Sequence, residues 1–256
     1  MTGDPEKLFI QRFLESLRPR WPLGRVLSVG CGTGELERGV ADQGAARHVD
    51  GVDVSESSLA AARHQAEVEG LNSIVHYHNC EAAAFLRAAV DANLGYDVVF
   101  FHGSLHHIEN LEEVLDLTAA VLRGGSPGLV YIDEYVGPSR NEWTAEDLGY
   151  AAGLFSRVPL QHRRIPEMRA PIALADPTEM IRSSEILPLV RERFTAAVEC
   201  PYYGNVLNPL VCAIRGSSLD EEEIQGLLRD AVDLEEFLIR RELLSPLYVA
   251  LYARPR

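Results

Sequence analysis

Three glycines at alternate positions follow a short apolar run near the start of the chain. The run Val26–Val29 has strand character, and Gly30, Gly32 and Gly34 come directly after it. Because glycine has no Cβ atom, a turn of this composition lets a ligand approach bare backbone. A second short apolar segment ends at Asp53. A glycine turn after one strand and an acid at the end of the next indicate a nucleoside site in a parallel α/β sheet.

The spacing of the glycines limits which nucleoside fits. A dinucleotide fingerprint, G-x-G-x-x-G, requires a third glycine at position 35, where this chain has Glu35. A carboxylate there would repel a pyrophosphate at the helix N-terminus, which disfavours NAD and FAD. The sequence contains no G-x-x-x-x-G-K-S/T stretch, so the usual ATP-binding loop is excluded.

The G-x-G-x-G turn resembles the first motif of the class I S-adenosylmethionine (SAM)-dependent methyltransferases. Residues 25–134 are similar to the core of this family in the order and spacing of their motifs. Tyr96–Phe101 followed by Ser104–Ile108 resembles the fourth strand and its "LHH" end in small-molecule methyltransferases, and Leu122–Gly125 resembles the approach to the fifth strand. The segment Glu134–Pro138 (EYVGP) resembles a bacterial subgroup often found near sugar or natural-product pathways.

The resemblance implies SAM as the cofactor and assigns residues to it. Asp53 is expected to accept hydrogen bonds from both ribose hydroxyls, a charge-assisted pair, and the glycines to approach the methionine part. Glu81 follows the third strand at a place where the family usually has Asp. The implied cofactor-binding residues are Gly30, Gly32, Gly34, Asp53, Val54, Cys80, Glu81 and His102.

The resemblance also points to candidate catalytic residues. Methyl transfer is an in-line displacement, so alignment is the main contribution, about 7–11 kcal/mol in well-oriented systems. A base is needed only for a hydroxyl or a protonated amine. His106 is the first candidate base and His107 the second, with purely structural packing as the alternative for both. Glu134 leaves the carboxyl end of the fifth strand, where open α/β sheets bind ligands; its alternative is a strand-end acid bonded to a lid.

Residues after the fifth strand are candidates for binding the methyl acceptor. His162 and Arg163, together with Arg164, suit a carboxylate or phosphate on the acceptor, with a solvated loop as the alternative. The predicted acceptor-binding residues are Tyr135, Arg140, His162, Arg163 and Tyr202. No metal is expected, because the His, Cys and acidic residues lack ligand spacing.

The chain's periodicity predicts the elements that position these residues. Strands alternating with helices favour an α/β fold with a doubly wound, mostly parallel sheet. Five strands are expected at Arg25–Val29, His48–Val52, Ile74–His78, Tyr96–Phe101 and Gly128–Asp133. The resemblance adds strands at 194–203 and 247–253, which makes a seven-stranded, Rossmann-like methyltransferase sheet. Helices are expected to begin at Asp176 and, through a capping box, at Ser218.

The regular pattern stops after the fifth strand. A long irregular stretch inside a compact domain is typical of a lid. We therefore expect an N-terminal helical segment over 1–23, a SAM-binding core over 24–136, a lid or acceptor-binding insertion over 137–176, and the rest of the core with its closing strands over 177–256.

Composition limits the partners. The 256 residues include 24 basic and 38 acidic side chains, a net charge of −14. Such a surface disfavours nucleic acid and anionic membranes. The four cysteines form no C-x-x-C pair, which suits a reducing compartment. With no visible secretory signal and no apolar run of about 18 residues, a cytoplasmic location is expected; a homodimer is left open.

Together these features predict a SAM-dependent methyltransferase that acts on an oxygen or nitrogen of a small molecule, a sugar or secondary metabolite. A second hypothesis is a SAM-binding enzyme of another class, such as a cyclase, decarboxylase or hydrolase, in which SAM serves as a structural cation. A third is a non-catalytic partner protein with a relic cofactor site.

Overall fold

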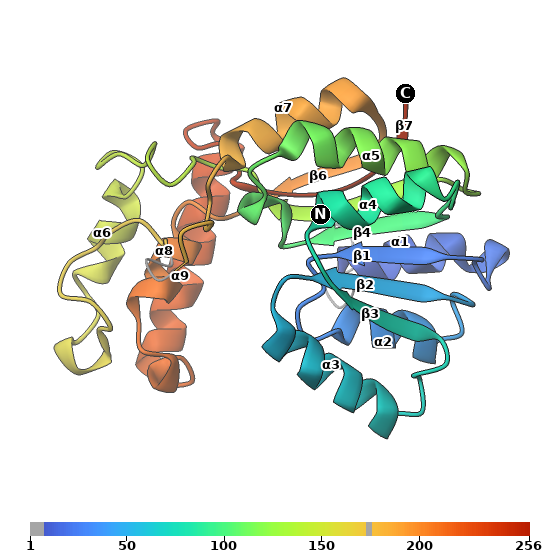
Figure 1. Cartoon of the computed structure of the whole chain (residues 1–256). Coiled ribbons are helices and arrows are strands. Elements are labelled where there is room, and N and C mark those ends of the chain that lie inside the picture. Colours follow the sequence, from blue (N-terminus) through green and yellow to red (C-terminus); the bar gives the residue numbers. More distant parts are fainter. Residues whose placement is uncertain (1–7, 173–175) are drawn as a thin grey trace. The chain divides into compact units, whose positions relative to one another are not determined.

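The computed structural model describes residues 8–172 and 176–256 of the chain. Residues 1–7 of the predicted N-terminal helical segment and residues 173–175 of the predicted lid lie outside these ranges. Figure 1 shows an α/β architecture built on one seven-stranded sheet, with the strand order β3-β2-β1-β4-β5-β7-β6. The predicted fold class is thereby confirmed.

The strands lie within a few residues of the predicted positions. They are β1 (Val26–Val29), β2 (Val49–Asp53), β3 (Val75–Asn79), β4 (Val98–His102), β5 (Leu129–Tyr135), β6 (Phe194–Tyr202) and β7 (Tyr248–Pro255). β1 pairs in parallel with both β2 and β4, so Val29 is in register with Val52 on one side and Phe101 on the other. The chain order reverses direction between β1 and β4, and open α/β sheets bind ligands at such a switch point.

The helices follow the predicted alternation through the first five strands. They are α1 (Phe9–Leu17), α2 (Glu35–Asp42), α3 (Glu56–Val68), α4 (Ala82–Asp91) and α5 (Leu111–Arg123), followed by α6 (Gly149–Phe155), α7 (Ser183–Arg193), α8 (Leu207–Ala213) and α9 (Glu222–Arg240). Short 3₁₀ turns lie at η1 (Arg18–Arg20), η2 (Leu105–His107), η3 (Leu160–His162) and η4 (Gly216–Ser218). Ser55 caps α3, its Oγ accepting from the Ser58 N–H at 3.3 Å.

Two predicted helix starts are wrong. Asp176 does not open a helix: its Oδ1 accepts from the backbone N–H and hydroxyl of Thr178 at 2.8 and 2.6 Å, which closes a turn, and α7 begins only at Ser183. Ser218 belongs to a 3₁₀ turn rather than a capping box, and α9 begins at Glu222. In both places short-range hydrogen bonds compete with helix initiation.

The described residues form two compact units. The first comprises the chain up to Glu134 together with residues 185–200 and 250–256, and the second comprises residues 135–184 and 201–249. This grouping places residues 201–249 with the segment expected to be a lid. The four-part division given above stays a prediction.

Aromatic packing dominates one core of the first unit. Phe13 of α1 lies 5.0 Å from the Tyr131 ring and meets Phe100 edge-on at 5.8 Å between ring centroids. All three side chains are almost wholly buried. Such pairs add to the free energy of area burial, and they attach α1 to the sheet.

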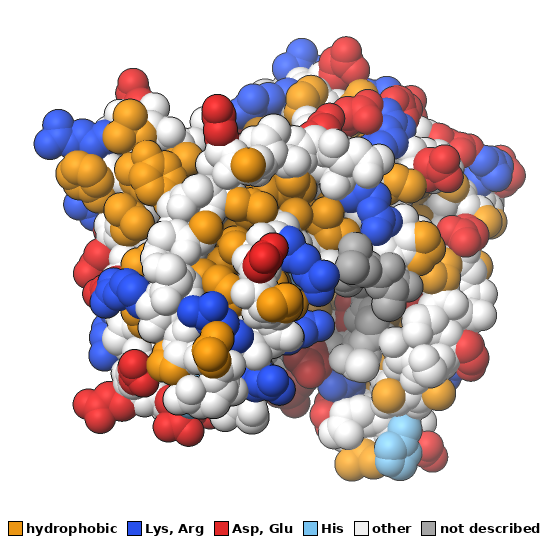
Figure 2. Space-filling model, turned by 90° about the vertical axis from the view of Figure 1, so that its left-hand side faces the viewer, with side chains coloured by type: hydrophobic (Ala, Val, Ile, Leu, Met, Phe, Trp, Pro, Cys, Tyr) orange, Lys and Arg blue, Asp and Glu red, His pale blue; other side chains and the backbone are white. Residues whose placement is uncertain are grey.

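The second unit has its own core between α6, α8 and α9. A buried carboxylate joins two of these helices: Glu235 of α9 accepts from the backbone N–H groups of Asn205, Val206 and Leu207 at the start of α8. Figure 2 views the face that carries these helices and shows arginine side chains among hydrophobic ones. Within the described residues, no helix is both long and apolar enough to cross a bilayer.

A buried acid also crosslinks the amino-terminal half of the parallel sheet. The Asp50 carboxylate, on β2, is 3% exposed. Its Oδ1 accepts from the Nε2 atoms of His48 and His78, at 3.0 and 2.8 Å, and its Oδ2 accepts from Arg25 Nη1 and Tyr96 Oη, both at 2.9 Å. Burial alone would raise the pKa of Asp50, but the hydrogen bonds from His78, Tyr96 and His48 outweigh it and hold the pKa well below its usual range.

The Asp50 cluster makes the protein sensitive to acid. We expect Asp50→Asn to lower the free energy of unfolding at pH 7 by about 2–4 kcal/mol, because the charge that several donors share is lost. A carboxyl whose pKa is depressed by folding stabilises above its unfolded pKa of about 3.9 and loses that contribution as pH falls through the folded value. The difference between the wild type and the variant should therefore shrink below about pH 4.

Denaturant unfolding at pH 7 and at pH 3.5 measures this effect. Asp42→Asn, at an exposed position on α2, is the matched control and should change stability little at either pH. A stability difference for Asp50→Asn that stays the same at both pH values would contradict the assignment.

Candidate functional site

The predicted glycine turn lies at the carboxyl end of β1, at the switch point of the sheet. Gly30, Gly32 and Gly34 all adopt positive φ angles, 73°, 53° and 74°. Only glycine adopts this region without strain. Gly34 also occupies the position that precedes the first turn of α2.

The three glycines serve different purposes. A Cβ atom at Gly30 would lie 2.4 Å from Ser104 Cβ, and one at Gly34 would lie 2.1 Å from the Tyr77 hydroxyl. A Cβ atom at Gly32 would meet nothing within 4 Å. Two of the glycines are thus required by packing inside the first unit, and Gly32 alone borders open space. The sequence did not distinguish these roles, because the neighbours Tyr77 and Ser104 come from β3 and from the segment after β4.

Asp53, at the end of β2, is bonded to the glycine turn. Its Oδ2 accepts from the Gly32 N–H at 2.8 Å, and its Oδ1 accepts from the Ser55 N–H at 2.8 Å. Each carboxylate oxygen has a second lone pair, so these bonds leave Asp53 able to accept from ligand hydroxyls. Asp53 therefore orders the glycine turn, and it is also the residue predicted to bind the ribose hydroxyls.

The other predicted cofactor residues lie on the neighbouring strand ends. Val54 follows β2 and is 62% exposed. Glu81 is the exposed residue that precedes α4, and His102 ends β4 with its Nε2 3.8 Å from Asp133 Oδ2. Burial, followed by the charge of Glu81, raises the pKa of the Cys80 thiol. Their places agree with a site at this edge, and their roles stay predictions.

Glu134 holds the turn that carries the two candidate bases. Its carboxylate is buried, and Oε2 accepts from the backbone N–H groups of Ser104 and Leu105 at 2.8 and 2.6 Å. Its Oε1 lies 2.5 Å from His106 Nδ1. Because a carboxylate is an acceptor, this bond places a proton on Nδ1 of His106 and makes Nε2 the acceptor nitrogen of the neutral ring.

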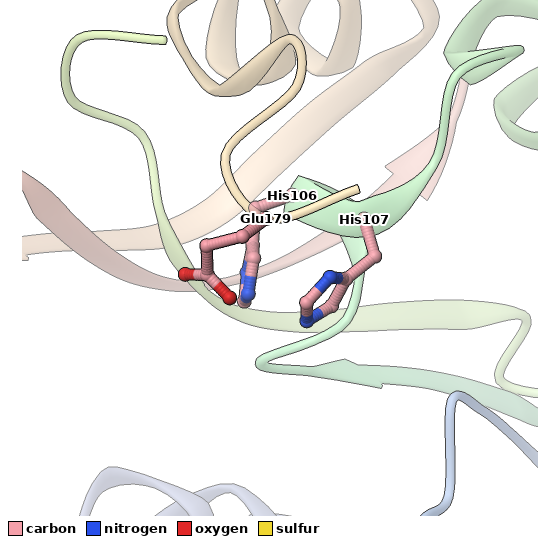
Figure 3. Close-up of side chains that lie close together, drawn as sticks. All are labelled: His106, His107 and Glu179. Carbon is pink, nitrogen blue, oxygen red and sulfur yellow. The ribbon is translucent and has the colours of Figure 1, made fainter. Parts of the chain in front are cut away.

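Figure 3 shows His106 and His107 side by side on the 3₁₀ turn after β4, with ring centroids 4.1 Å apart. Glu179, drawn in the same figure, belongs to the second unit. His106 is the better-oriented candidate of the pair, since a buried acid sets its tautomer. The arrangement resembles a general base with its orienting group.

Two titratable residues near the glycine turn were not predicted from the sequence. Glu37 of α2 is 1% exposed, and neither of its carboxylate oxygens has a hydrogen-bond partner among the described residues. Burial raises the pKa of Glu37 to about 7. Burial also raises the pKa of the Cys31 thiol, and the charges of Glu37 and Asp53 add to this effect. Cys31 is therefore a poor nucleophile, because it stays protonated.

Several predicted acceptor residues support the second unit's own structure. The Tyr135 hydroxyl donates to the Pro138 carbonyl at 3.0 Å, and burial raises its pKa. Arg140 Nη1 donates to the carbonyls of Asp176 and Pro177 at 3.2 and 2.6 Å. These interactions hold loops together, and ligand binding by Tyr135 and Arg140 stays a prediction.

The remaining candidates for acceptor binding, Arg163, Tyr202 and His162, also lie in the second unit, and the first two have contacts within it. Arg163 donates to the carbonyls of Val158 and Ser156, and its guanidinium lies over the Phe155 ring at 4.7 Å. Tyr202 stacks on Tyr248, with centroids 5.4 Å apart, and the partly buried His162 ends η3. The guanidinium of Arg163 is thus already engaged within its own loop.

Comparison with known proteins bears on the first unit most directly. Residues 26–125 match a family model described as a methyltransferase domain. A curated relative, the ubiquinone biosynthesis O-methyltransferase of Azoarcus sp. (strain BH72), is 35% identical over 101 residues, which cover 40% of each chain. The similarity thus spans less than half the length of that relative. The residues that match the family model include the glycine turn, Asp53 and both candidate histidines.

Solved structures share the fold over nearly the whole chain. Geranyl diphosphate methyltransferase in complex with SAM superimposes with a TM-score of 0.58 at 15% identity, covering 96% of this chain and 84% of that one. The cyclase SpnF superimposes with a TM-score of 0.53 at 19% identity, covering 99% of this chain and 85% of that one. At such identities the likeness establishes the fold alone.

Replacing Gly34 tests whether the turn packs as described. We expect Gly34→Ala to lower the free energy of unfolding by more than about 2 kcal/mol, because left-handed backbone costs a non-glycine residue roughly 1–2 kcal/mol and the clash with Tyr77 adds to it. Adding Tyr77→Ala should relieve the clash and recover the stability lost through it, but it should leave the backbone strain in place. Thermal and denaturant unfolding measure both terms.

Gly39→Ala is the matched control for this measurement. Gly39 lies inside α2, and a Cβ atom there would meet nothing within 4 Å. This substitution should stabilise the protein by up to about 1 kcal/mol. If Gly34→Ala were tolerated as well as Gly32→Ala, which meets no neighbour, the proposed packing on Tyr77 would be refuted.

Proposed function

We propose that this protein is a SAM-dependent methyltransferase that transfers a methyl group to an oxygen or nitrogen of a small molecule. The observation that carries the proposal is the glycine turn bonded to Asp53 at the switch point of the sheet, within the residues that match a methyltransferase domain. The fold agrees with it, since a SAM-bound methyltransferase superimposes on 96% of the chain.

The residues at this edge suit a nucleoside with a ribose and no phosphate. Gly32 borders open space, so a ligand can approach the turn closely there. The two Asp53 oxygens are held by backbone N–H groups in an orientation that leaves acceptor capacity for the two ribose hydroxyls. Glu81, Cys80, Val54 and His102 complete the proposed contacts from the neighbouring strand ends.

The chain's own contribution to the reaction is alignment and proton transfer. SAM supplies a methyl carbon already activated by a sulfonium, so the acceptor displaces a thioether leaving group. His106 takes the proton that the acceptor oxygen or nitrogen loses, and Glu134 positions His106 through Nδ1. Glu134 is a positioning residue, because its buried oxygens are bonded to the turn and to His106. His107 is the second candidate for the proton acceptor.

The acceptor class is proposed from the relatives and from the sequence. The relative from Azoarcus is named for O-methylation in ubiquinone biosynthesis, which supports oxygen as the methylated atom. A sugar or secondary metabolite as acceptor, a cytoplasmic location and a homodimer stay predictions. So does the acceptor set of Tyr135, Arg140, His162, Arg163 and Tyr202.

A SAM-binding enzyme of another class is the second candidate. The observation that favours it is the likeness to the cyclase SpnF, which covers 99% of this chain. The two candidates differ in their products: a methyltransferase releases S-adenosylhomocysteine together with a product heavier by one methyl group. Turnover of a substrate with SAM left intact would support the alternative.

Asp53 provides the test of cofactor binding. We expect Asp53→Ala to weaken the binding of S-adenosylhomocysteine by roughly 10- to 100-fold, because hydrogen bonds to a charged group are each worth about 1.5–3 kcal/mol. Isothermal titration calorimetry measures the affinity, and circular dichroism checks the fold. Asp42→Ala, at an exposed carboxylate on α2, should bind like the wild type. No heat on titrating the wild-type protein would refute the proposed function.

His106 provides the test of the base. With an acceptor found by screening for methyl gain, His106→Ala should lower kcat by about 10²–10⁴-fold, the usual contribution of a general base. The affinity for S-adenosylhomocysteine should stay within about twofold of the wild-type value, since His106 has no proposed contact to the cofactor. His64→Ala, at an exposed position on α3, is the control.

Glu134→Gln tests whether Glu134 acts by positioning His106 or only by stabilising the fold. It should reduce kcat and change the pH–rate profile, because the imidazolium formed during proton transfer loses its carboxylate partner. A variant with normal stability and an unchanged pH–rate profile would show that Glu134 does not act through His106.

A further inference from the structure

The second unit contains a cavity of about 310 Å³ that the proposed contacts do not use. Its walls are the loop of residues 164–172, residues 179–180, one side of α8 and the start of β7. All of these segments belong to the second unit. The volume lies at the lower end of the range for small-molecule sites, about 300–1,000 Å³.

About half of the cavity wall is apolar, and part of that half is packed in a hydrophobic cluster. Ile172, Met180 and Tyr248 belong to one hydrophobic cluster, in which the Tyr248 ring is stacked on Tyr202 and meets Tyr135 edge-on at 5.3 Å. Such packing keeps the wall in place without a ligand, and a preformed wall reduces the cost of binding. The wall suits the apolar body of a small organic molecule.

Two arginines that line the cavity have no side-chain partner among the described residues. The guanidinium groups of Arg164 and Arg169 form no hydrogen bond or ion pair with any residue in the described ranges. The neighbouring Arg163, in contrast, donates to two backbone carbonyls of its own loop. In a chain with a net charge of −14, carboxylates are plentiful, yet none in residues 8–172 and 176–256 pairs with these two cations.

The backbone fixes the first of these arginines beside α8. The Arg164 N–H donates to the Ala213 carbonyl at 2.8 Å, and Arg163 forms an antiparallel bridge with Ile214. Arg164 therefore enters the cavity from an ordered segment that is attached to the end of a helix. These bonds hold the Arg164 backbone, and its exposed, planar guanidinium has the forked geometry that suits the oxygens of a carboxylate or phosphate.

Polar groups beside the arginines set the charge of the cavity. Glu179 contributes one negative charge against the two positive charges of Arg164 and Arg169. Cys212 Sγ lies 3.6 Å from Asn208 Oδ1, so Asn208 adds an amide donor to the lining. Burial raises the pKa of Cys212, so its thiol stays neutral and takes no part in charge recognition.

Met180 adds an independent sign of a constrained site. Its φ angle is +53°, a left-handed conformation that is uncommon for a residue with a Cβ atom. The side chain is buried, and the Met180 carbonyl accepts from the Arg140 N–H at 2.8 Å. Residues held in such conformations are concentrated at ligand sites.

We propose that this cavity binds a small organic acid, a molecule with an apolar body and a carboxylate or phosphate that Arg164 and Arg169 recognise. The identification of this acid as the methyl acceptor rests on the proposed function; the binding itself does not. The apolar wall determines the body of the ligand, and the two unpartnered cations determine its charged end.

Binding is tested first without SAM. The probes are 4-hydroxyphenylacetate, phenyl phosphate and the neutral 4-hydroxyphenylacetamide, each titrated into the full chain and followed by ligand-observed NMR. We expect the two anions to bind and the amide to bind at least tenfold more weakly. Stronger binding of either anion tells whether carboxylate or phosphate is preferred, and equal binding of acid and amide overturns the proposal.

Variants assign the binding to the cavity. Arg164→Gln and Arg169→Gln should each weaken binding of the preferred anion by roughly tenfold, the cost of losing about one charged hydrogen-bonding partner. Arg157→Gln is the control, because Arg157 is exposed and pairs with Asp230 outside the cavity. Unchanged binding in both cavity variants overturns the proposal.

Cys212 supplies a readout that does not depend on a variant. Alkylation of Cys212 by iodoacetamide, followed by mass spectrometry, should slow by at least fivefold when the preferred anion is bound. Cys80 lies outside the cavity lining and is the internal reference, whose rate should not change. Equal protection of both cysteines, or of neither, places the ligand elsewhere and overturns the proposal.

The acceptor role is tested separately. Organic acids and their matched amides are incubated with SAM and screened for methyl gain, and we expect the acids to be methylated. Arg164→Gln should raise the KM for the acid roughly tenfold and leave the affinity for S-adenosylhomocysteine unchanged. Methylation of amides alone overturns the acceptor role. Anion binding in a protein that does not bind S-adenosylhomocysteine would refute the proposed function and leave the cavity assignment standing.

Discussion

The contact between Asp53 and the glycine turn is the constraint on which the proposed site depends. Two parallel strands, β1 and β2, end beside each other, and the carboxylate of one accepts from the backbone of the turn after the other. A charged acceptor on a turn of left-handed residues offsets the conformational entropy that glycines lose on folding. The turn is therefore ordered before any ligand arrives, which lowers the cost of binding.

Glu134 performs the same task on the other side of the switch point. It joins the end of β5 to the backbone and the imidazole that follow β4. The two acids thus order two neighbouring segments, one proposed to bind the nucleoside and the other to carry the base. Both use backbone N–H groups, which cannot change rotamer, as their main partners. These bonds order the edge of the sheet where the proposed reaction requires alignment.

Buried or partly buried carboxylates with several donors recur throughout the chain. Asp50 crosslinks the strands near their amino-terminal ends, and Asp97 accepts from the backbone N–H groups of Gly24, Arg25 and Ser126. Glu235 does the same at the start of α8 in the second unit. In a strongly acidic chain these residues use negative charge to form specific long-range bonds, whereas the guanidinium groups of Arg164 and Arg169 have no partner in the part of the chain that the structure describes. That contrast is the basis for assigning an anionic ligand to the second unit.

The sequence by itself determined the alternating α/β order, the first five strands and the place of the glycine turn and Asp53. These features depend on hydrophobic periodicity and on glycine's backbone freedom, which act over a few residues. It failed at Asp176, whose side chain bonds to nearby backbone instead of opening a helix, and at Ser218, which lies in a 3₁₀ turn before α9. It also gave no sign of α8. The different roles of Gly30, Gly32 and Gly34, the His106–Glu134 pair and the cavity beside Arg164 were decided only by tertiary structure. Each depends on groups 28 or more residues apart, such as His106 and Glu134, which meet only because strands from distant parts of the chain end at one edge of the sheet.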